Sequence, residues 1–284
     1  MDLVRNKLCV GGGRGVDSSS TMVFERSLNL SGTTRRPHSL FREGETRIRS
    51  VVQTLADRKV FRRSAGGVSQ SLISYFRGAL IENAPLRFSA FWGVGRKGQV
   101  DDPEKFAVQF MQDWMARVAS LLELEWHCDF LLTDTHALAN GIAQDLIDRY
   151  CLSAIDTLQG PHCGFQRLTA FLTKEGLANV LDLASSWDQD GLLWESLPEA
   201  IKSELSRLAG IHACDREPHM AAMLYVKLNT IESAILSRSL VGRAFVTYLP
   251  PSFAFLLPSL PLIHTYVGPD HLVRRPWFDG SAYA

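Results

Sequence analysis

The sequence predicts an α/β fold, a single Rossmann-like domain with a mainly parallel sheet. Segments with the helical period alternate with short apolar runs typical of strands, which is the pattern of α/β proteins. Apolar residues make up 46% of the 284 residues, enough to fill a sizeable core. The run 130–134 begins with three apolar residues, as expected of a central strand covered by helices on both faces. We place this domain at residues 46–284, after a flexible basic arm at residues 1–45.

The order of the elements follows from their periods and their end signals. Pro85 ends a helical segment just before an apolar strand, and Asp102 as N-cap with Pro103 in the first turn predicts a long helix after it. The capping-box spacing from Ser196 predicts a later helix that starts at Leu197. We expect helices at residues 46–55, 68–80, 102–124, 142–158 and 220–235, and strands at 86–92, 130–134, 165–168, 243–249 and 260–267.

The charges balance overall, with 30 Lys and Arg against 30 Asp and Glu, which argues against a nucleic-acid partner. Residues 1–63 are nevertheless basic, with 13 Lys and Arg against 6 Asp and Glu. Because aromatic residues do not alternate with the arginines of Arg35-Arg36 and Arg62-Arg63, a solvated arm is favoured over an RNA-binding one.

Membrane and export signals are not apparent in the sequence. Charged residues interrupt the stretch 3–10, and four prolines interrupt the apolar stretch 244–266, which excludes a continuous spanning helix there. The five cysteines are an odd number without the spacing of a disulfide framework, which fits reduced thiols. We therefore expect a cytoplasmic protein.

The first candidate site follows the strand at residues 130–134. Ligands of parallel sheets bind beyond the carboxyl ends of the strands, and Asp134 and His136 fall at that place. We expect both to be catalytic, so that Asp134→Asn should abolish turnover and leave the melting temperature nearly unchanged. The alternative is that Asp134 caps a turn and His136 is a surface loop residue.

The second candidate is the glycine-containing loop after the strand at residues 86–92. Its glycines and cations could let the backbone approach a phosphate or a carboxylate, so we expect Ser89, Trp92, Arg96 and Lys97 to bind substrate at the same sheet edge as Asp134. A plain glycine turn with solvated cations explains the loop equally well.

A late helix carries a polar line beside its apolar stripe. Tyr225, Asn229 and Glu232 fall at positions i, i+4 and i+7, and a carboxylate on a mostly buried helix needs a partner. We expect Glu232 to be catalytic and to receive a substrate amino group. A salt bridge to Arg243 or Lys227 is the alternative.

The carboxyl-terminal run supplies the last candidates. Tyr248 and His264 end or interrupt apolar strands, and Arg275 could neutralise an anion, so we expect all three to bind substrate. Core packing is the alternative explanation of the aromatic residues. No metal is expected, because His127-Cys128 and His162-Cys163 lack the paired spacing of a closed zinc site. No cofactor is expected either.

The order of these landmarks resembles that of the isocyanide (isonitrile) synthases over about residues 85–251. The landmarks are the strand ending in Trp92, the acidic helix start at 101–104, the strand ending in Thr133-Asp134, the helix with Glu232 and the strand 245–248. The resemblance implies a modified Rossmann-like fold and an enzyme that converts the amino group of an amino acid into an isocyanide. It also implies ribulose 5-phosphate as the carbon donor, and Asp134 at the position of the family's acidic residue.

Two functions of different classes follow. The first is a small-molecule biosynthetic enzyme that acts on an amino acid and a sugar phosphate. The second is a non-catalytic protein that docks partners through the basic arm and the aromatic carboxyl terminus. The sequence indicates no oligomeric state. Convergence of Asp134, His136 and Arg96 on one cleft would favour the enzyme.

Overall fold

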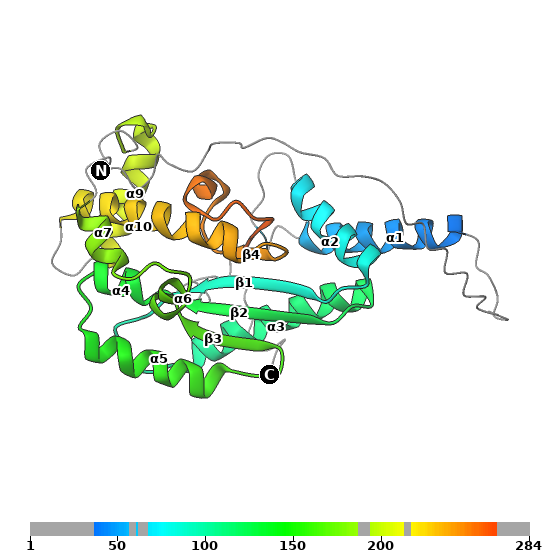
Figure 1. The fold of residues 1–284 in the computed structure, drawn as a ribbon, viewed down its shortest axis with the longest axis horizontal. Coiled ribbons are helices and arrows are strands. Elements are labelled where there is room, and N and C mark those ends of the chain that lie inside the picture. Colours follow the sequence, from blue (N-terminus) through cyan, green and yellow to red (C-terminus); the bar gives the residue numbers. More distant parts are fainter. Residues whose placement is uncertain (1–36, 57–60, 62–67, 187–193, 213–216, 266–284) are drawn as a thin grey trace, which may run out of the picture. The chain divides into compact units, whose positions relative to one another are not determined.

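A five-stranded, fully parallel sheet organises the fold (Figure 1). The structure, a computed structural model, describes residues 37–56, 61, 68–186, 194–212 and 217–265. The strands are β1 (Leu86–Trp92), β2 (Trp126–Leu132), β3 (Cys163–Arg167), β4 (Ala244–Thr247) and β5 (Leu262–His264), and their order in the sheet is β3-β2-β1-β4-β5. The chain builds outward from β1 to β3 and then returns to the other side of β1, so the winding direction reverses between β1 and β4.

Helices connect the strands and cover the sheet. They are α1 (Pro37–Leu55), α2 (Gln70–Glu82), α3 (Asp102–Leu122), α4 (Asp134–Ala139), α5 (Gln144–Leu158), α6 (Leu168–Lys174), α7 (Val180–Ser186), α9 (Glu199–His212) and α10 (Pro218–Ser239), with a 3-10 helix η1 (Pro251–Leu256) between β4 and β5. None of the helices in these ranges is long and apolar enough to cross a membrane.

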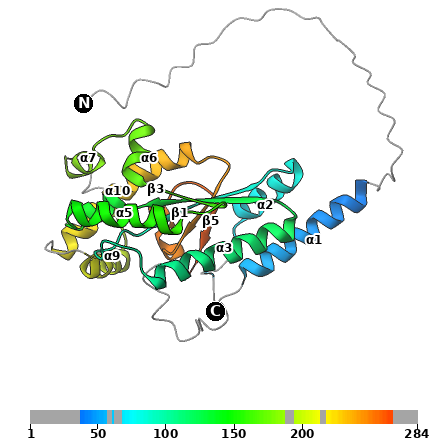
Figure 2. The ribbon, with the colours of Figure 1, turned by 90° about the horizontal axis from the view of Figure 1, so that it is seen from below.

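The alternation of side chains along each strand creates two cores, one on each face of the sheet. Phe88, Ala90 and Trp92 of β1 pack into the core that α1, α2, α3 and α5 complete. Figure 2 shows α1 running alongside α3 in this layer. Phe91 of β1 and Leu131 of β2 point to the other face and pack against α6, α7, α9 and α10. Both faces are therefore covered, which explains the apolar runs at the carboxyl ends of β1 and β2.

A capping box fixes the start of α3, the helix that follows β1. Asp101 is the N-cap, and its side chain accepts a hydrogen bond from the Glu104 backbone N–H, while the Glu104 carboxylate accepts one from the backbone N–H of Asp101. Asp101, and not Asp102, is thus the N-cap, and Pro103 lies in the first turn.

The predicted α/β class is confirmed, and the boundaries of several elements differ. α1 begins at Pro37, inside the stretch expected to be a flexible arm, and α9 begins at Glu199 rather than at Leu197. The last two strands are shorter than expected. β4 stops at Thr247 and β5 starts only after Pro261, because proline cannot donate to a strand ladder.

Candidate functional site

The carboxyl ends of β1 and β2 meet at one edge of the sheet. Trp92 and Leu132 are register partners, and both the N–H and the hydroxyl of Thr133 donate to the carbonyl of Trp92, over 2.9 and 3.2 Å. α4 begins at the next residue. In open parallel sheets ligands bind at this edge, next to the point where the winding direction reverses. α4 and the ends of β1 and β4 are therefore the place to search for a site.

Four residues form a buried polar cluster here: His136 of α4 and Tyr225, Asn229 and Glu232 of α10. His136 Nε2 and Glu232 Oε2 are 2.7 Å apart, although the two residues lie 96 positions apart in the sequence. Glu232 is fully buried, and the His136 side chain is only 11% exposed. The Tyr225 ring meets the imidazole edge-on with centroids 5.2 Å apart, and Phe91 flanks it at 6.0 Å.

Two acceptor atoms of this cluster lack a partner within the described part of the chain. They are Oε1 of Glu232 and Oδ1 of Asn229, and both residues are fully buried. The Asn229 amide nitrogen is satisfied, because it donates to the carbonyl of Tyr225 over 2.8 Å. Buried polar atoms without a partner are rare in folded proteins, and each one needs a reason. These two acceptors, one helical turn apart, can accept hydrogen bonds from a bound molecule that brings donors.

The pair of His136 and Glu232 has the geometry of a base and the group that orients it. With a neutral imidazole, the contact to the carboxylate assigns the proton to Nε2, which leaves Nδ1 as a bare acceptor. A proton taken up at Nδ1 would form an imidazolium beside the Glu232 carboxylate, which stabilises that charge. The arrangement can therefore accept a proton from a bound molecule.

Tyr225 adds a phenol that stays protonated. Burial raises its pKa, and the neighbouring Tyr248 and Glu232 raise it further, while the Asn229 amide acts in the opposite direction. Tyr225 is therefore a hydrogen-bond donor at any physiological pH. Tyr248, which follows β4 and is half-buried, lies near enough to Tyr225 to act on it electrostatically.

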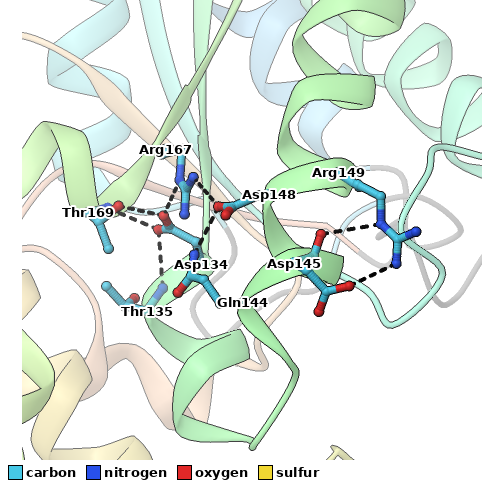
Figure 3. A network of polar contacts seen from close by, with 8 residues as sticks. All are labelled: Asp134, Thr135, Gln144, Asp145, Asp148, Arg149, Arg167 and Thr169. Atoms are coloured by element: carbon cyan, nitrogen blue, oxygen red, sulfur yellow. Dashed lines mark hydrogen bonds and ion pairs between the residues drawn. The ribbon is translucent and has the colours of Figure 1, made fainter.

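Asp134 lies two residues before His136 and has a different environment (Figure 3). Its Oδ2 accepts from Nε of Arg167 over 2.7 Å and from the hydroxyl of Thr169, and its Oδ1 accepts from the N–H groups of Thr169 and Thr135 over 3.0 and 3.1 Å. Asp134 is fully buried, and each of its oxygens already has two donors. The structure brings His136 and Glu232 together but turns the Asp134 carboxylate toward β3 and α6.

Sequence reasoning missed the partners of Asp134. Arg167 ends β3, Thr169 lies in the first turn of α6, and Asp148 of α5 accepts from Nη1 of Arg167 over 2.6 Å. Their position after the next parallel strand is a usable signal, because the ends of neighbouring parallel strands meet at one edge. The apolar pattern of β3 is weak, so the sequence did not draw attention to the residues at its end.

The residues of the glycine-containing loop do not gather around His136. Ser89 lies in the middle of β1, where Arg243 approaches its hydroxyl at 3.4 Å. Trp92 faces the opposite core and donates its indole N–H to the Tyr150 hydroxyl over 3.0 Å. Arg96 is exposed, and Lys97 forms an ion pair with Asp101. The expected meeting of Ser89 with Asp134 and His136 is therefore wrong, because Ser89 lies in the middle of β1 and not at its end. Trp92 does end β1, but its side chain points to the other face.

The α3 N-terminus is closed by the chain's own carboxylates. In dinucleotide-binding sheets the helix after the first strand receives the pyrophosphate at its N-terminus. Here the Asp101 and Glu104 carboxylates bind the N–H groups of Glu104 and Asp101, and their negative charges disfavour an anion at that turn. An anion would have to bind elsewhere.

The remaining predicted residues have separate surroundings. His264 ends β5 and its Nδ1 lies 2.8 Å from the carbonyl of Leu249. Arg243 pairs with Asp129 and not with Glu232. Arg275 lies outside the described residues, as do residues 1–36 and most of the aromatic carboxyl terminus on which the docking hypothesis depends. Across the described ranges, no group of three or more His, Cys, Asp or Glu side chains could hold a metal ion.

No protein-family model and no curated protein matches this sequence. Among solved structures, the PvcA (PA2254) protein from Pseudomonas aeruginosa has a similar fold, with a TM-score of 0.59, 13% identity, and coverage of 82% of this chain and 86% of that one. A tyrosyl-tRNA synthetase from Archaeoglobus fulgidus, complexed with L-tyrosine, aligns with a TM-score of 0.43, 14% identity, and coverage of 77% of this chain and 63% of the other. At these identities, the likeness to PvcA shows a shared α/β fold.

Proposed function

We propose that this protein is a biosynthetic enzyme of isocyanide synthase type. The fold shared with PvcA over most of both chains favours this class. The resemblance in the order of landmarks over residues 85–251 supports it independently. The strand order is that of the first five strands of Rossmann-type sheets, so we include a Rossmann-like architecture in the proposal.

One observation carries the proposal: a buried His136–Glu232 pair beside acceptor atoms that the described chain leaves without partners. An amino acid would bring an ammonium group with three N–H donors. Oε1 of Glu232 and Oδ1 of Asn229 could accept two of them, and the Glu232 carboxylate would balance the charge. A primary ammonium group therefore supplies donors of the right kind, and enough of them, for both acceptors.

The residues of the cluster would divide the work between binding and proton transfer. The Glu232 carboxylate would take a proton from the substrate nitrogen at Oε1 and so free the nitrogen lone pair to attack the sugar carbonyl. His136 would hold this carboxylate in place through Nε2, and the Tyr225 phenol would donate to an oxygen of the bound molecule. A positioned base of this kind typically contributes about 10²–10⁴-fold to the rate.

The carbon donor in this proposal is a sugar phosphate such as ribulose 5-phosphate, and the proposed location is the cytoplasm. Cys128, Cys151 and Cys163 are free and buried, in keeping with a reducing compartment. Arg96 and Lys97 are exposed in the loop after β1 and are the cations of this loop that could approach a phosphate.

The proposal is tested by incubating the full chain with each of the twenty common amino acids and ribulose 5-phosphate. At least one amino acid should release phosphate and give a product with the isocyanide stretch in its infrared spectrum. His136→Gln and Glu232→Gln should abolish both signals. Glu204→Gln is the matched control, because Glu204 is a glutamate that pairs with Arg207 on the surface of α9.

Absence of an isocyanide with every amino acid, from protein that is folded, would overturn the isocyanide chemistry. Full activity of Glu232→Gln would overturn the assignment of the site.

A further inference from the structure

The carboxylate of Asp134 joins three elements around the start of α4. Arg167 closes β3, Thr169 lies in the first turn of α6, and Asp134 itself is the first residue of α4. All of the accepting capacity described above goes to these neighbours, so the carboxylate has none left for a substrate. We therefore consider a structural role for Asp134, in holding neighbouring elements in place.

What it holds is the short helix that carries His136. α4 spans Asp134–Ala139, too short to be stable by itself. On one side Thr133 ties its start to the end of β1, and on the other side Asp134 ties it to β3 and α6. Glu232 approaches from α10, a separate element. The 2.7 Å contact between His136 and Glu232 therefore depends on where these ties place α4.

Arg167 extends the same connection toward the surface. Its side chain is 30% exposed, and it bridges the fully buried Asp134 and the half-exposed Asp148 of α5. Figure 3 shows this bridge together with a second arginine, Arg149 of α5, which pairs with Asp145 on its own helix. The chain thus offers a pair of arginines in similar ion pairs, of which one is tied to α4.

We propose that Arg167 and Thr169 are positioning residues that, through Asp134, set the imidazole of His136 against the Glu232 carboxylate. Neither residue touches the substrate in this proposal. It rests on the proposed function only in that His136 is the group worth positioning, and it concerns the ligand-free protein.

The test is the imidazole N–H signal of His136 in the full chain labelled with ¹⁵N-histidine. His136→Gln assigns the signal by its disappearance. The wild-type protein should show a protected Nε2–H resonance, because this proton lies in the contact to Glu232. Thr169→Val, which removes one donor to Asp134, and Arg167→Gln should lose that resonance to solvent exchange.

Conservative variants separate positioning from general loosening of the fold. Thr169→Ser keeps the hydroxyl and should restore the signal, and Arg149→Gln should leave it unchanged. A wild-type His136 signal in folded Thr169→Val and Arg167→Gln would overturn the proposal, and so would its loss in Arg149→Gln. If Arg167→Gln does not fold, Thr169→Val decides, because it leaves the ion pair in place.

The experiment uses no substrate. Failure to find an isocyanide product would therefore leave this inference standing, and an unchanged His136 signal would leave the proposed chemistry standing.

Discussion

Asp134 and His136 lie two residues apart on the same short helix, and their surroundings differ in kind. Each of the two oxygens of the Asp134 carboxylate accepts two hydrogen bonds. The carboxylate that faces His136 has one oxygen bound and one without a described partner. A buried group that the chain itself satisfies stabilises the fold, whereas a buried group left partly unsatisfied costs stability unless a ligand completes it. The second group is thus the better candidate for function.

The largest expected effect is the loss of stability in Asp134→Ala. Removal of the Asp134 carboxylate leaves four donors, from Arg167, Thr169 and Thr135, without their acceptor, and we expect a cost of about 3–5 kcal/mol. We expect this loss in urea-induced unfolding. Because the carboxylate accepts four hydrogen bonds, we also predict a lower melting temperature for Asp134→Asn, in place of the nearly unchanged value that the sequence led us to expect.

Asp145→Ala is the control for that measurement. Asp145 pairs with Arg149 on the exposed face of α5, where an ion pair contributes at most about 0.5 kcal/mol. Equal losses of unfolding free energy in Asp134→Ala and Asp145→Ala would contradict the claim that the buried carboxylate contributes more than the surface ion pair.

Trp92→Phe should give the next largest loss, about 1–3 kcal/mol, because a smaller ring leaves a cavity and the Tyr150 hydroxyl loses a donor. Trp126→Phe, at a half-buried ring stacked on His162, should cost less. Since Trp92 faces the core opposite to His136, its substitution should leave amino-acid binding unchanged in calorimetry. Weaker amino-acid binding by a folded Trp92→Phe protein would contradict this and would show that Trp92 contributes to the site.

Glu232→Gln should change the free energy of unfolding by less than about 1 kcal/mol, since the amide has the shape of the carboxylate and its oxygen can still accept from His136. Activity should nevertheless be lost. The comparison with Asp134 fails if Glu232→Gln destabilises the protein as much as Asp134→Ala does.

The smallest expected effect is a change of stability with pH at Glu104 of α3. The Glu104 carboxylate accepts a hydrogen bond from the Tyr150 hydroxyl. Burial raises its pKa above the ordinary value of 4.5, so the folded protein holds this proton more tightly than the unfolded chain. Its contribution to stability is therefore fully present below pH 4.5 and is lost as the pH rises through the folded-state pKa. The stability difference between the wild type and Glu104→Gln should fall from pH 4.5 toward neutrality; a constant difference would contradict this.

The sequence predicted most of the elements because their signals are local. Pro85 and Gly93 bound β1 at the expected residues, and the acidic start of α3 is misplaced by only one position. The ends of elements that depend on distant partners were harder to predict from the sequence. β5 pairs only with β4 among the described strands, and its length follows from that pairing and from Pro261 rather than from its own apolar run.

The site could be predicted only in part. The 3.6-residue period placed Asn229 and Glu232 on one line of α10, which was sufficient to single out Glu232 as a carboxylate in need of a partner. That His136 is this partner, and that Arg167 takes Asp134 away from it, depends on how α4 sits between β3 and α10. Nothing local to those residues encodes it.

The most direct measurement of the central claim is the His136 imidazole spectrum of the wild type and of Glu232→Gln as amino acids are added one at a time. We predict that at least one amino acid shifts the His136 resonances in the wild type, because its amino group enters the cluster beside Oε1 of Glu232, and that Glu232→Gln abolishes the shift. An amino acid that binds in calorimetry without moving His136, or that moves it equally in Glu232→Gln, would contradict the claim that this cluster is the functional site.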